Sequence, residues 1–485
     1  MSAGCWNGRL HVLRRKFFSG DLLHSGSAAS DQTPTALFLN EQRLGIVTDL
    51  YELTMAAAYW SAGLADNRAT FDLFFRELPP HRSYMVTAGL EQAVHYLLNL
   101  QFAESDVNYL RSQPVFAHAP ADWYEALRRL RFTGDVWAIP EGTVVFPNEP
   151  LMRVTGPAME AQIAETYLLT SLAFQTSVAS KAARLVSAAG GRNVVDFGSR
   201  RAHGPQAGLL AARASFIGGC VGTSNTAAAE QLGIQPVGTM AHSWIMAFED
   251  EREAFRNFAA VFPERATFLI DTYDTIEGAR NAVRCGAKPA AVRLDSGDFV
   301  ALSKQVRQIL DEAGWRDVTI FASGDLNEYK IANLIAAGSP IDSFGVGTEL
   351  VTVAEAPSLG VVYKLVDFEG TRDHSGRIKL STHKQTYPGR KQVFRESRSD
   401  GTFHRDVIGL ASESLPGEPL LELVVSGGKL VRPMPSLQNL QLRSRNQVGR
   451  LPTPLLALER GWTYPVEISS MLQAEFDRLA MARQE

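Results

Sequence analysis

The middle of the chain, from Asn193 to Leu350, alternates short apolar runs with amphipathic stretches. Each apolar run finishes in Gly, Asp, Ser or Thr, as is typical of a buried strand that ends in a polar loop. The runs are NVVDFG, FIGGCVGTS, PVGTM, TFLIDTY, AAVRLDSG, TIFASGD and SFGVGTE. Two stretches between them, 299–314 and 327–338, carry apolar residues every three or four positions and end at a glycine, which predicts helices.

About seven such strand–helix units predict a parallel sheet, either closed into a TIM-like barrel or doubly wound. Because the units are compact, we expect a small, irregular α/β barrel. In both architectures ligands bind at the carboxyl ends of the strands. The polar residues of this segment fall at those ends, so we expect the chemistry there.

The sequence before the barrel predicts mixed structure. A helix is expected over 48–60, capped by Thr48 or Asp49, and a long helix over 157–191. Strands are expected over 69–78 and 134–146, the second broken by a Pro-Glu-Gly turn.

After Val351 the apolar runs shorten and alternate with Gly-rich turns, which predicts an antiparallel sheet, and the tail from about Gln438 predicts loops and helices. We therefore expect residues 37–190 and 351–485 to form one flanking α+β domain beside a barrel of residues 191–350.

Residues 1–36 are predicted to be an N-terminal extension. The segment is basic, with no acidic residue before Asp21, so a transit-like peptide is one interpretation. A disordered tail or a misassigned start codon are the others, and the Ser/Ala-rich stretch that follows, typical of a linker, favours these two.

Composition narrows the function class. Lys and Arg total 48 against 52 Asp and Glu, a net charge of −4, which argues against a dedicated nucleic-acid-binding protein. No run reaches the roughly 18 apolar residues of a membrane span. The three cysteines, Cys5, Cys220 and Cys285, lie far apart and indicate a reducing compartment. We expect a soluble, cytoplasmic enzyme.

Charged residues follow two of the predicted strands. In DFGSRRAHG, Arg200 and Arg201 suit a phosphate or carboxylate, because a guanidinium can donate two parallel hydrogen bonds; a solvated basic loop is the alternative. In AVRLDSGDF, Arg293, Asp295 and Asp298 interrupt a buried strand, where unpaired charge is costly. Arg293 would bind an anion and Asp295 ribose hydroxyls or a hydrated Mg²⁺, unless the two simply form an internal ion pair.

Two further loops carry candidates. GTMAHSWIMAF places Thr239 and His242 at a strand end, where His242, in an apolar setting, is either a core histidine or a general base, phosphate ligand or nucleophile. Gly324, Gly345 and Gly347 allow a phosphate to approach the backbone. Together these residues predict a site for a phosphorylated sugar, with Mg²⁺, at the mouth of the barrel.

Six long segments resemble nicotinate phosphoribosyltransferases: TDLYELTMAAAYW, DFGSRRAHGPQAGLLAARASFIGGCVGTSN, GTMAHSWIMAF, RLDSGDF, SGDLNEYKI and GVGTELVT. The resemblance covers roughly Leu37 to the C-terminus. It implies a type II phosphoribosyltransferase fold, an irregular α/β barrel beside an α+β domain. It also implies synthesis of nicotinate mononucleotide from nicotinate and phosphoribosyl pyrophosphate, with Mg²⁺ and coupled ATP hydrolysis, as the first step of NAD salvage. Active sites shared across a homodimer are expected.

The resemblance also implies residue roles. Tyr51 would cover the pyridine ring from the other subunit, opposite Phe197, while Thr239 and Arg293 would contact nicotinate. His242 would be phosphorylated by ATP and, with Arg293 and Asp295, make up the catalytic set. The remaining substrate-binding residues would lie around the ribose and phosphates: Arg200, Asp295, Gly324, Asp325, Gly347 and Thr348.

Three alternatives differ in substrate or class. In nicotinamide phosphoribosyltransferases an acidic residue is expected where this chain has Ser224, and a carboxylate there would repel nicotinate, so Ser224 favours nicotinate. Quinolinate phosphoribosyltransferase fits less well, because it is a shorter chain without these motifs. A non-catalytic binding protein on the same scaffold is the rival from another class.

Overall fold

The computed structural model describes residues 39–370, 374–381 and 385–482. The predicted extension, residues 1–36, lies outside the described residues. The chain divides into two units, Met1–Asn40 and Glu41–Glu485. The elements that follow belong to the second unit.

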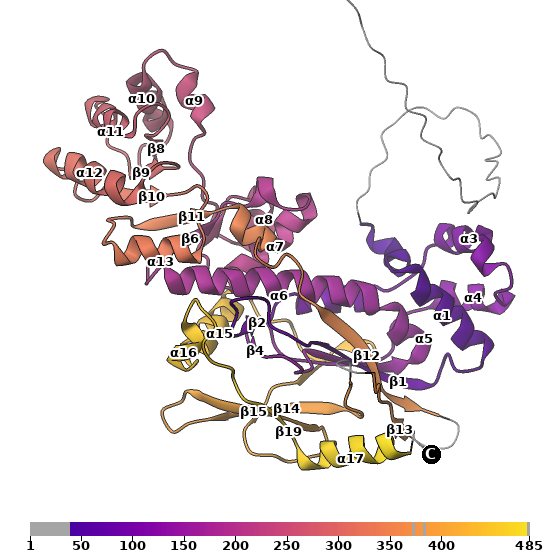
Figure 1. Ribbon diagram of the computed structural model, residues 1–485. Helices are drawn as coiled ribbons and strands as arrows, with labels where there is room; N and C mark the ends of the chain where they lie inside the picture. The colour runs from indigo at the N-terminus through magenta and orange to yellow at the C-terminus, as the bar shows by residue number, and fades with distance from the viewer. Residues whose placement is uncertain (1–38, 371–373, 382–384, 483–485) are drawn as a thin grey trace, which may run out of the picture. The chain divides into compact units, whose positions relative to one another are not determined.

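Six described strands form a curled parallel sheet in the middle of the chain (Figure 1). They are β6 (Asn193–Asp196), β7 (Gly222–Thr223), β8 (Thr267–Leu269), β9 (Ala291–Leu294), β10 (Thr319–Ala322) and β11 (Ser343–Val346). Their order is β7-β6-β11-β10-β9-β8, so the first strand in the chain, β6, pairs with the last, β11. Pro236 adds a single bridge to Thr223 beyond β7. All seven predicted runs therefore follow one another around an open, irregular barrel, as expected.

Helices follow the strands and cover the sheet. They are η3 (Ser199–Arg201), α7 (Pro205–Ile217), α8 (Thr226–Leu232), α9 (His242–Met246), α10 (Glu251–Val261), α11 (Thr275–Arg284), α12 (Phe299–Glu312), α13 (Glu328–Ala336) and α14 (Thr348–Thr352). The helices predicted over 299–314 and 327–338 are confirmed as α12 and α13, which end before left-handed glycines, Gly314 and Gly338.

One detail of the sequence interpretation is wrong. Asp298 does not interrupt the buried strand, because β9 ends at Leu294 and Asp298 is the exposed N-cap of α12. Its carboxylate accepts hydrogen bonds from the backbone N–H groups of Val300 and Ala301, at 3.0 and 3.2 Å. The carboxylate of Asp298 therefore caps the N-terminus of α12.

The flanking domain draws its strands from both ends of the chain, as predicted. One sheet has the order β13-β12-β1-β5-β3-β17-β18, in which N-terminal β1 pairs with C-terminal β12. A second has the order β16-β14-β15-β19, and a third pairs β2 with β4. The strands are β1 (Arg68–Phe75), β2 (Met85–Val86), β3 (Asp135–Ala138), β4 (Val144–Val145), β5 (Met152–Pro157), β12 (Val361–Glu369), β13 (His374–Gly376), β14 (Lys391–Ser397), β15 (Phe403–Leu410), β16 (Glu418–Pro419), β17 (Glu422–Ser426), β18 (Lys429–Leu430) and β19 (Val466–Ile468).

The helices of this domain are η1 (Glu41–Ile46), α1 (Leu50–Ser61), α2 (Leu90–Leu98), α3 (Glu104–Ser112), η2 (Pro114–Phe116), α4 (Ala121–Arg129), α5 (Ala158–Ile163), α6 (Glu165–Ala188), α15 (Leu437–Gly449), α16 (Thr453–Leu456) and α17 (Ser470–Met481). The helix predicted over 48–60 is α1, although its N-cap Asp49 makes no side-chain capping bond. The helix predicted over 157–191 divides into α5 and α6 at Ala164. The residue boundaries of the predicted domains stay predictions.

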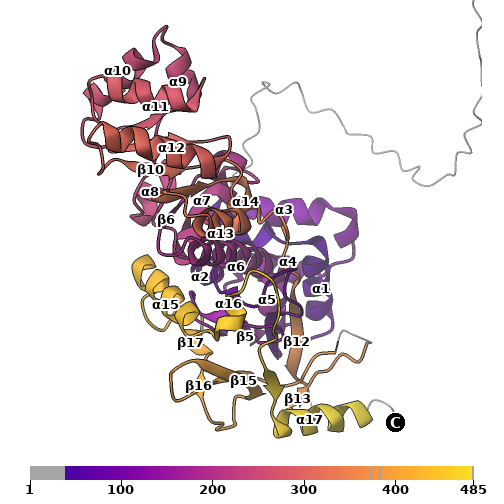
Figure 2. The ribbon, with the colours of Figure 1, turned by 60° about the vertical axis from the view of Figure 1, so that its left-hand side comes forward.

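Helix α6 packs between the barrel and the flanking domain. Its side chains from Gln175 to Leu185 are all buried, since it packs against α7 and α13 on the barrel side (Figure 2) and against β2 on the other (Figure 1). A helix buried on all sides loses a clear polar face. Those buried positions include two charged residues, Lys181 and Arg184.

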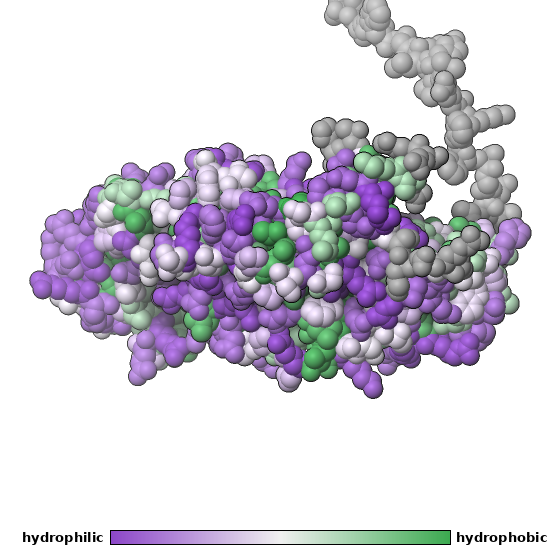
Figure 3. Space-filling model, turned by 90° about the horizontal axis from the view of Figure 1, so that it is seen from below, coloured by the Kyte–Doolittle hydropathy of each residue, from purple (hydrophilic) through white to green (hydrophobic). Residues whose placement is uncertain are grey.

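One face of the molecule is shown in Figure 3, coloured by hydropathy. The face in Figure 3 is mostly hydrophilic, with apolar residues in separate patches. Within the described ranges, no helix combines the length and the apolarity needed to cross a bilayer.

Candidate active site

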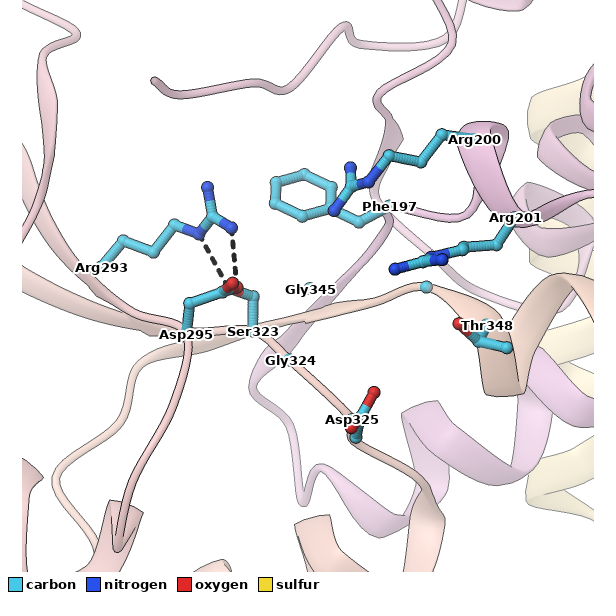
Figure 4. Close-up of a pocket in the computed structure, with 11 residues that line it drawn as sticks. Phe197, Arg200, Arg201, Arg293, Asp295, Ser323, Gly324, Asp325, Gly345 and Thr348 are labelled. Carbon is cyan, nitrogen blue, oxygen red and sulfur yellow. Dashed lines mark hydrogen bonds and ion pairs between the residues drawn. The ribbon is translucent and has the colours of Figure 1, made fainter. Parts of the chain in front are cut away.

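A cavity of about 210 Å³ opens at the carboxyl ends of four barrel strands (Figure 4). The last residues of β9 and β11 and the segments that follow β6, β9, β10 and β11 supply its lining, which is Phe197, Arg200, Arg201, Arg293, Asp295, Ser323, Gly324, Asp325, Gly345, Gly347 and Thr348. Parallel strands bring their carboxyl ends to one edge, so residues far apart in sequence meet there. Arg293 and the Arg200–Arg201 pair lie on opposite sides of the cavity, with the ring of Phe197 between them.

Arg293 is the most firmly held charged group in the cavity. Its guanidinium donates to Ser323 Oγ at 2.7 Å and to Asp295 Oδ1 at 2.7 Å. It also donates to Thr239 Oγ1 at 2.9 Å and to the carbonyl of Met240 at 3.2 Å. The side chain is 9% exposed and these contacts use four of its five N–H donors, so the guanidinium is fixed in orientation and one N–H, on Nη2, is left for a group bound in the cavity.

Asp295 is a carboxylate at neutral pH. Burial acts to raise its pKa, but the Arg293 guanidinium and a hydrogen bond from Ser323 outweigh burial and hold the pKa of Asp295 below its ordinary value. Its backbone N–H donates to Asp271 Oδ2 at 2.9 Å. The charge of Asp295 is thus present whenever the cavity is in use.

An aromatic floor lies beside Arg293. Phe197 packs against Phe321 with ring centroids 5.2 Å apart, and the Arg293 Cζ lies 5.7 Å from the Phe197 ring centre. A Cβ on Gly345 would come within 2.8 Å of both rings, so a larger residue there would displace them. The arrangement suits a flat ring that carries an anionic group.

The other side of the cavity suits phosphate. Arg200 and Arg201 are exposed on η3 and face it, beside Thr348, the first residue of α14. Gly324 adopts a φ of +116°, and a Cβ there would collide with the carbonyl of Asp295. Only glycine fits this turn, which leaves the backbone open to a bound group.

Comparison with known proteins identifies the family. The pncB2 nicotinate phosphoribosyltransferase of Mycobacterium tuberculosis is 47% identical over 445 residues, which cover 90% of this chain and 94% of the relative. The chain belongs to the nicotinate phosphoribosyltransferase family. The Bacillus subtilis nicotinate phosphoribosyltransferase is 38% identical and covers 88% of this chain and 94% of its own length. The crystal structure of human nicotinic acid phosphoribosyltransferase matches with a TM-score of 0.79 and 31% identity, over 89% of this chain and 99% of the human chain.

Family models divide the chain along its architecture. The nicotinate phosphoribosyltransferase N-terminal domain matches residues 46–173, and the C-terminal domain of the same family matches residues 416–475. The quinolinate phosphoribosyltransferase C-terminal domain matches residues 178–356, which hold the curled sheet. These matches confirm the predicted type II phosphoribosyltransferase fold.

His242 lies at the rim of the cavity. It begins α9, its Nδ1 lies 3.2 Å from Thr272 Oγ1, and its Nε2 lies 3.8 Å from Asp295 Oδ2. Its side chain is 41% exposed, so the core histidine, one of the alternatives that the sequence left open, is wrong.

Most predicted site residues meet in the cavity, and four do not line it. Thr239 accepts a hydrogen bond from Arg293, and His242 lies 3.8 Å from Asp295. Both of these partners line the cavity. Ser224 follows β7, half-buried, and its backbone N–H donates to the carbonyl of Asp196 at 2.8 Å. Tyr51 lies on α1, by the other end of α6 from the barrel strands (Figure 1), and is 46% exposed. The roles assigned to these residues stay predictions.

Sequence reasoning missed Ser323 and Asp271. Ser323 fixes both Arg293 and Asp295, and Asp271 fixes the loop after Asp295 by accepting from Ser296 Oγ at 2.7 Å. Both residues end apolar runs, TIFASGD and TFLIDTY, so the rule that found Asp295 could have found them.

Mg²⁺ fits this cavity only together with a substrate. Among the described residues, no group of three or more His, Cys, Asp or Glu side chains is arranged to hold a metal. Asp295 and Asp325 both line the cavity. Mg²⁺ commonly binds one or two carboxylates and completes its shell with phosphate oxygens and water, which matches this donor set.

Proposed function

We propose that this chain transfers the phosphoribosyl group of phosphoribosyl pyrophosphate to the ring nitrogen of nicotinate, which yields nicotinate mononucleotide and pyrophosphate. The observation that carries the proposal is the placing of two anion sites on either side of Phe197, one beside an aromatic floor and the other formed by paired arginines. The relatives' names support the same reaction. In this reading the enzyme acts in the cytoplasm, in the first step of NAD salvage from nicotinate.

Nicotinate fits the side of the cavity that holds Arg293. Its pyridine ring would lie on Phe197, and its carboxylate would meet the guanidinium that Thr239 and Ser323 orient. The ring nitrogen then points toward the centre of the cavity. Holding the nucleophile in line with the anomeric carbon contributes to catalysis by lowering the entropy cost of the reaction.

The ribose and phosphates fit the remaining space. Arg200, Arg201 and the turn at Gly324 would hold the phosphates, while Asp295 would lie near the ribose, where the anomeric carbon gains positive charge as pyrophosphate leaves. When bound, Mg²⁺ would neutralise the departing pyrophosphate, with Asp295 and Asp325 as its protein ligands.

His242 is proposed to couple ATP to the reaction. Its neutral ring nitrogen would attack the γ-phosphorus of ATP and form an N–P bond as the bond to ADP breaks. Water would later attack the same phosphorus, so that the N–P bond breaks, inorganic phosphate leaves and the imidazole is restored. Support comes from the exposure of the ring and its 3.8 Å separation from Asp295. That carboxylate joins the histidine to the cavity.

A homodimer is proposed to complete the site. Leu50, Tyr51 and Met55 are exposed on the first turns of α1. Tyr51 does not line the cavity of its own chain, so it is available to cover the pyridine ring bound by a second copy. Aromatic and Met side chains are typical of such interfaces.

The test is product formation from phosphoribosyl pyrophosphate and Mg²⁺ with nicotinate, nicotinamide or quinolinate offered separately, with and without ATP. We expect nicotinate mononucleotide from nicotinate, made faster with ATP. Turnover of nicotinamide instead would show that Ser224 and Arg293 are misread. Turnover of none of the three would favour the binding protein on the same scaffold.

A further inference from the structure

A cluster of six charged side chains, four of them buried and two partly exposed, lies between α6 and the loops that form the phosphate side of the cavity. Its cations are Arg82, Lys181 and Arg184, and its carboxylates are Glu328, Glu349 and Glu355. Lys181 is the central member, because its ammonium contacts all three carboxylates. Three positive and three negative charges balance, as buried ionic groups require.

The contacts of Lys181 are close. Its Nζ lies 2.6 Å from Glu328 Oε2, 2.9 Å from Glu355 Oε2 and 3.5 Å from Glu349 Oε2. The Lys181 side chain is 2% exposed and that of Glu328 is 1% exposed. Burial acts to raise the pKa of Glu328, but Lys181 and Arg184 outweigh it and lower that pKa, so the carboxylate is ionised.

Two of the three carboxylates, Glu328 and Glu349, lie close in sequence to residues that line the cavity. Glu328 is the first residue of α13, three positions after Asp325, which lines the cavity. Glu349 directly follows Thr348, another lining residue, at the start of α14. One ammonium on the long helix α6 thus joins the loops after β10 and β11.

The segment after α14 has an uncommon backbone conformation, which contacts with the surrounding structure must hold in place. Val353 ends α14 with a φ of +47° and a ψ of +58°, the left-handed region that a β-branched residue rarely adopts. Glu355 lies two residues further on, held by both Lys181 and Arg82. The surrounding structure must impose this backbone conformation. The ion pairs of Lys181 with Glu349 and Glu355 hold the chain on both sides of Val353.

We propose that Lys181 is a positioning residue for the phosphoribosyl pyrophosphate side of the site. It holds the loops 324–328 and 347–355 at a fixed separation on α6, so that the groups for the phosphates are in place before the substrate arrives. The inference rests on the proposed function, since it assigns these loops to the phosphates. Lys181 itself lines no part of the cavity and touches no substrate.

The test compares steady-state constants for both substrates in Lys181→Met and in a matched control, Arg395→Met. Arg395 is an equally buried cation, 1% exposed and paired with Asp406 at 2.5 Å, but it lies on β14 of the flanking domain and its partner on the adjacent strand β15. We expect Lys181→Met to raise KM for phosphoribosyl pyrophosphate about tenfold, with KM for nicotinate unchanged within twofold. Arg395→Met should lower the unfolding temperature and leave both KM values unchanged.

A double variant distinguishes a positioning role of Lys181 from a role in balancing buried charge alone. Lys181→Met with Glu349→Gln removes one charge of each sign, so the unfolding temperature should recover while KM for phosphoribosyl pyrophosphate stays raised. Recovery of KM as well would overturn the proposal, and so would a Lys181→Met enzyme with unchanged KM values. The double variant also provides the answer if Lys181→Met alone does not fold.

Hydrogen exchange gives a readout that does not depend on turnover. Backbone amides in 324–328 and 347–355 should exchange faster in the double variant than in the native chain, and amides of β14 and β15 should not. If the native chain turns over none of the pyridine substrates, the proposed function fails while this measurement still decides the role of Lys181. Unchanged exchange in both loops would show that Lys181 does not hold them.

Discussion

The Nε2 atom of His242 lies 3.8 Å from the Oδ2 atom of Asp295, the carboxylate that lines the cavity. The other oxygen of Asp295 accepts from Arg293, so a change at the rim histidine reaches the nicotinate side of the site through one residue. A phosphoryl group on His242 would add about −1.5 to −2 charges beside Asp295. Repulsion between them would shift Asp295 and release Arg293 for its substrate.

Replacing the histidine therefore removes the coupling. In His242→Asn, we expect the ratio of the rates with and without ATP to fall to about one, because the amide cannot accept a phosphoryl group. Transfer of label from γ-labelled ATP to the protein should be lost. Thr272→Val keeps the histidine but removes its hydrogen-bond partner, so labelling should slow without disappearing. ATP-stimulated turnover in His242→Asn would contradict the role.

The turn at Gly324 provides a second prediction. Gly324→Ala combines a left-handed φ with a collision against the carbonyl of Asp295, so it should lower the free energy of unfolding by about 2–3 kcal/mol. Because the collision displaces Asp295, kcat/KM should fall more than tenfold. Urea unfolding and steady-state rates measure the two effects.

Gly233→Ala is the matched control for that turn. Gly233 has a φ of +65° but open space around its Cβ position, and it lies after α8. The Gly233→Ala substitution should lower the free energy of unfolding by about 1 kcal/mol and leave kcat/KM unchanged. Equal activity losses in the two variants would mean that the close approach to Asp295 is unimportant.

The barrel was predictable because its signal is repeated. Each buried strand is a short apolar run that ends in a polar residue, and α12 and α13 add a clear helical period and a final glycine. Strands of two residues, such as β2 and β4, carry no pattern of their own. Their pairing depends on tertiary contacts, and so does the parallel pairing of β19 with β15.

The site residues that could be predicted are those whose charged side chains follow a buried apolar run. Arg293 and Asp295 were found because charge at the end of a buried strand requires a partner, and both line the cavity. The same rule misplaced Asp298, since an aspartate after a strand also begins helices. Lys181 escaped notice because a lysine on a helix is ordinarily solvated, and its three carboxylates lie 147 or more positions away in sequence.

Ser224 allows a test of substrate choice. A carboxylate at this position would repel the carboxylate of nicotinate and accept from the amide of nicotinamide, so Ser224→Asp should lower kcat/KM for nicotinate at least tenfold and raise it for nicotinamide. Ser224→Asn is the uncharged control, and it should keep the preference for nicotinate. If both variants lose nicotinate turnover equally, the effect comes from side-chain size and not from charge.

A buried carboxyl group beside the proposed dimer surface makes stability depend on pH. The pKa of Glu52 is raised to about 7, against 4.5 for an ordinary glutamate, chiefly by burial; hydrogen bonds from Tyr51 and Gln162 oppose the rise, and the nearby charges of Glu165 and Asp49 add to it. Its Oε2 accepts from Gln162 at 2.6 Å, while Oε1 is buried without a hydrogen-bond partner. A protonated Glu52 suits this setting better than an ionised one.

The sign of the pH effect follows from linkage. The folded state holds the Glu52 proton more tightly than the unfolded state does, so the contribution of this group to stability is complete below about pH 4.5 and is lost as the pH rises through about 7. Glu52→Gln keeps an acceptor for Gln162 and cannot ionise. We expect the free energy of unfolding of this variant, relative to that of the native chain, to rise by about 2–3 kcal/mol between pH 5 and pH 8, measured by urea titration. An equal gain at both pH values, or a loss of stability at pH 8, would show that Glu52 is already ionised when folded and paired with a cation.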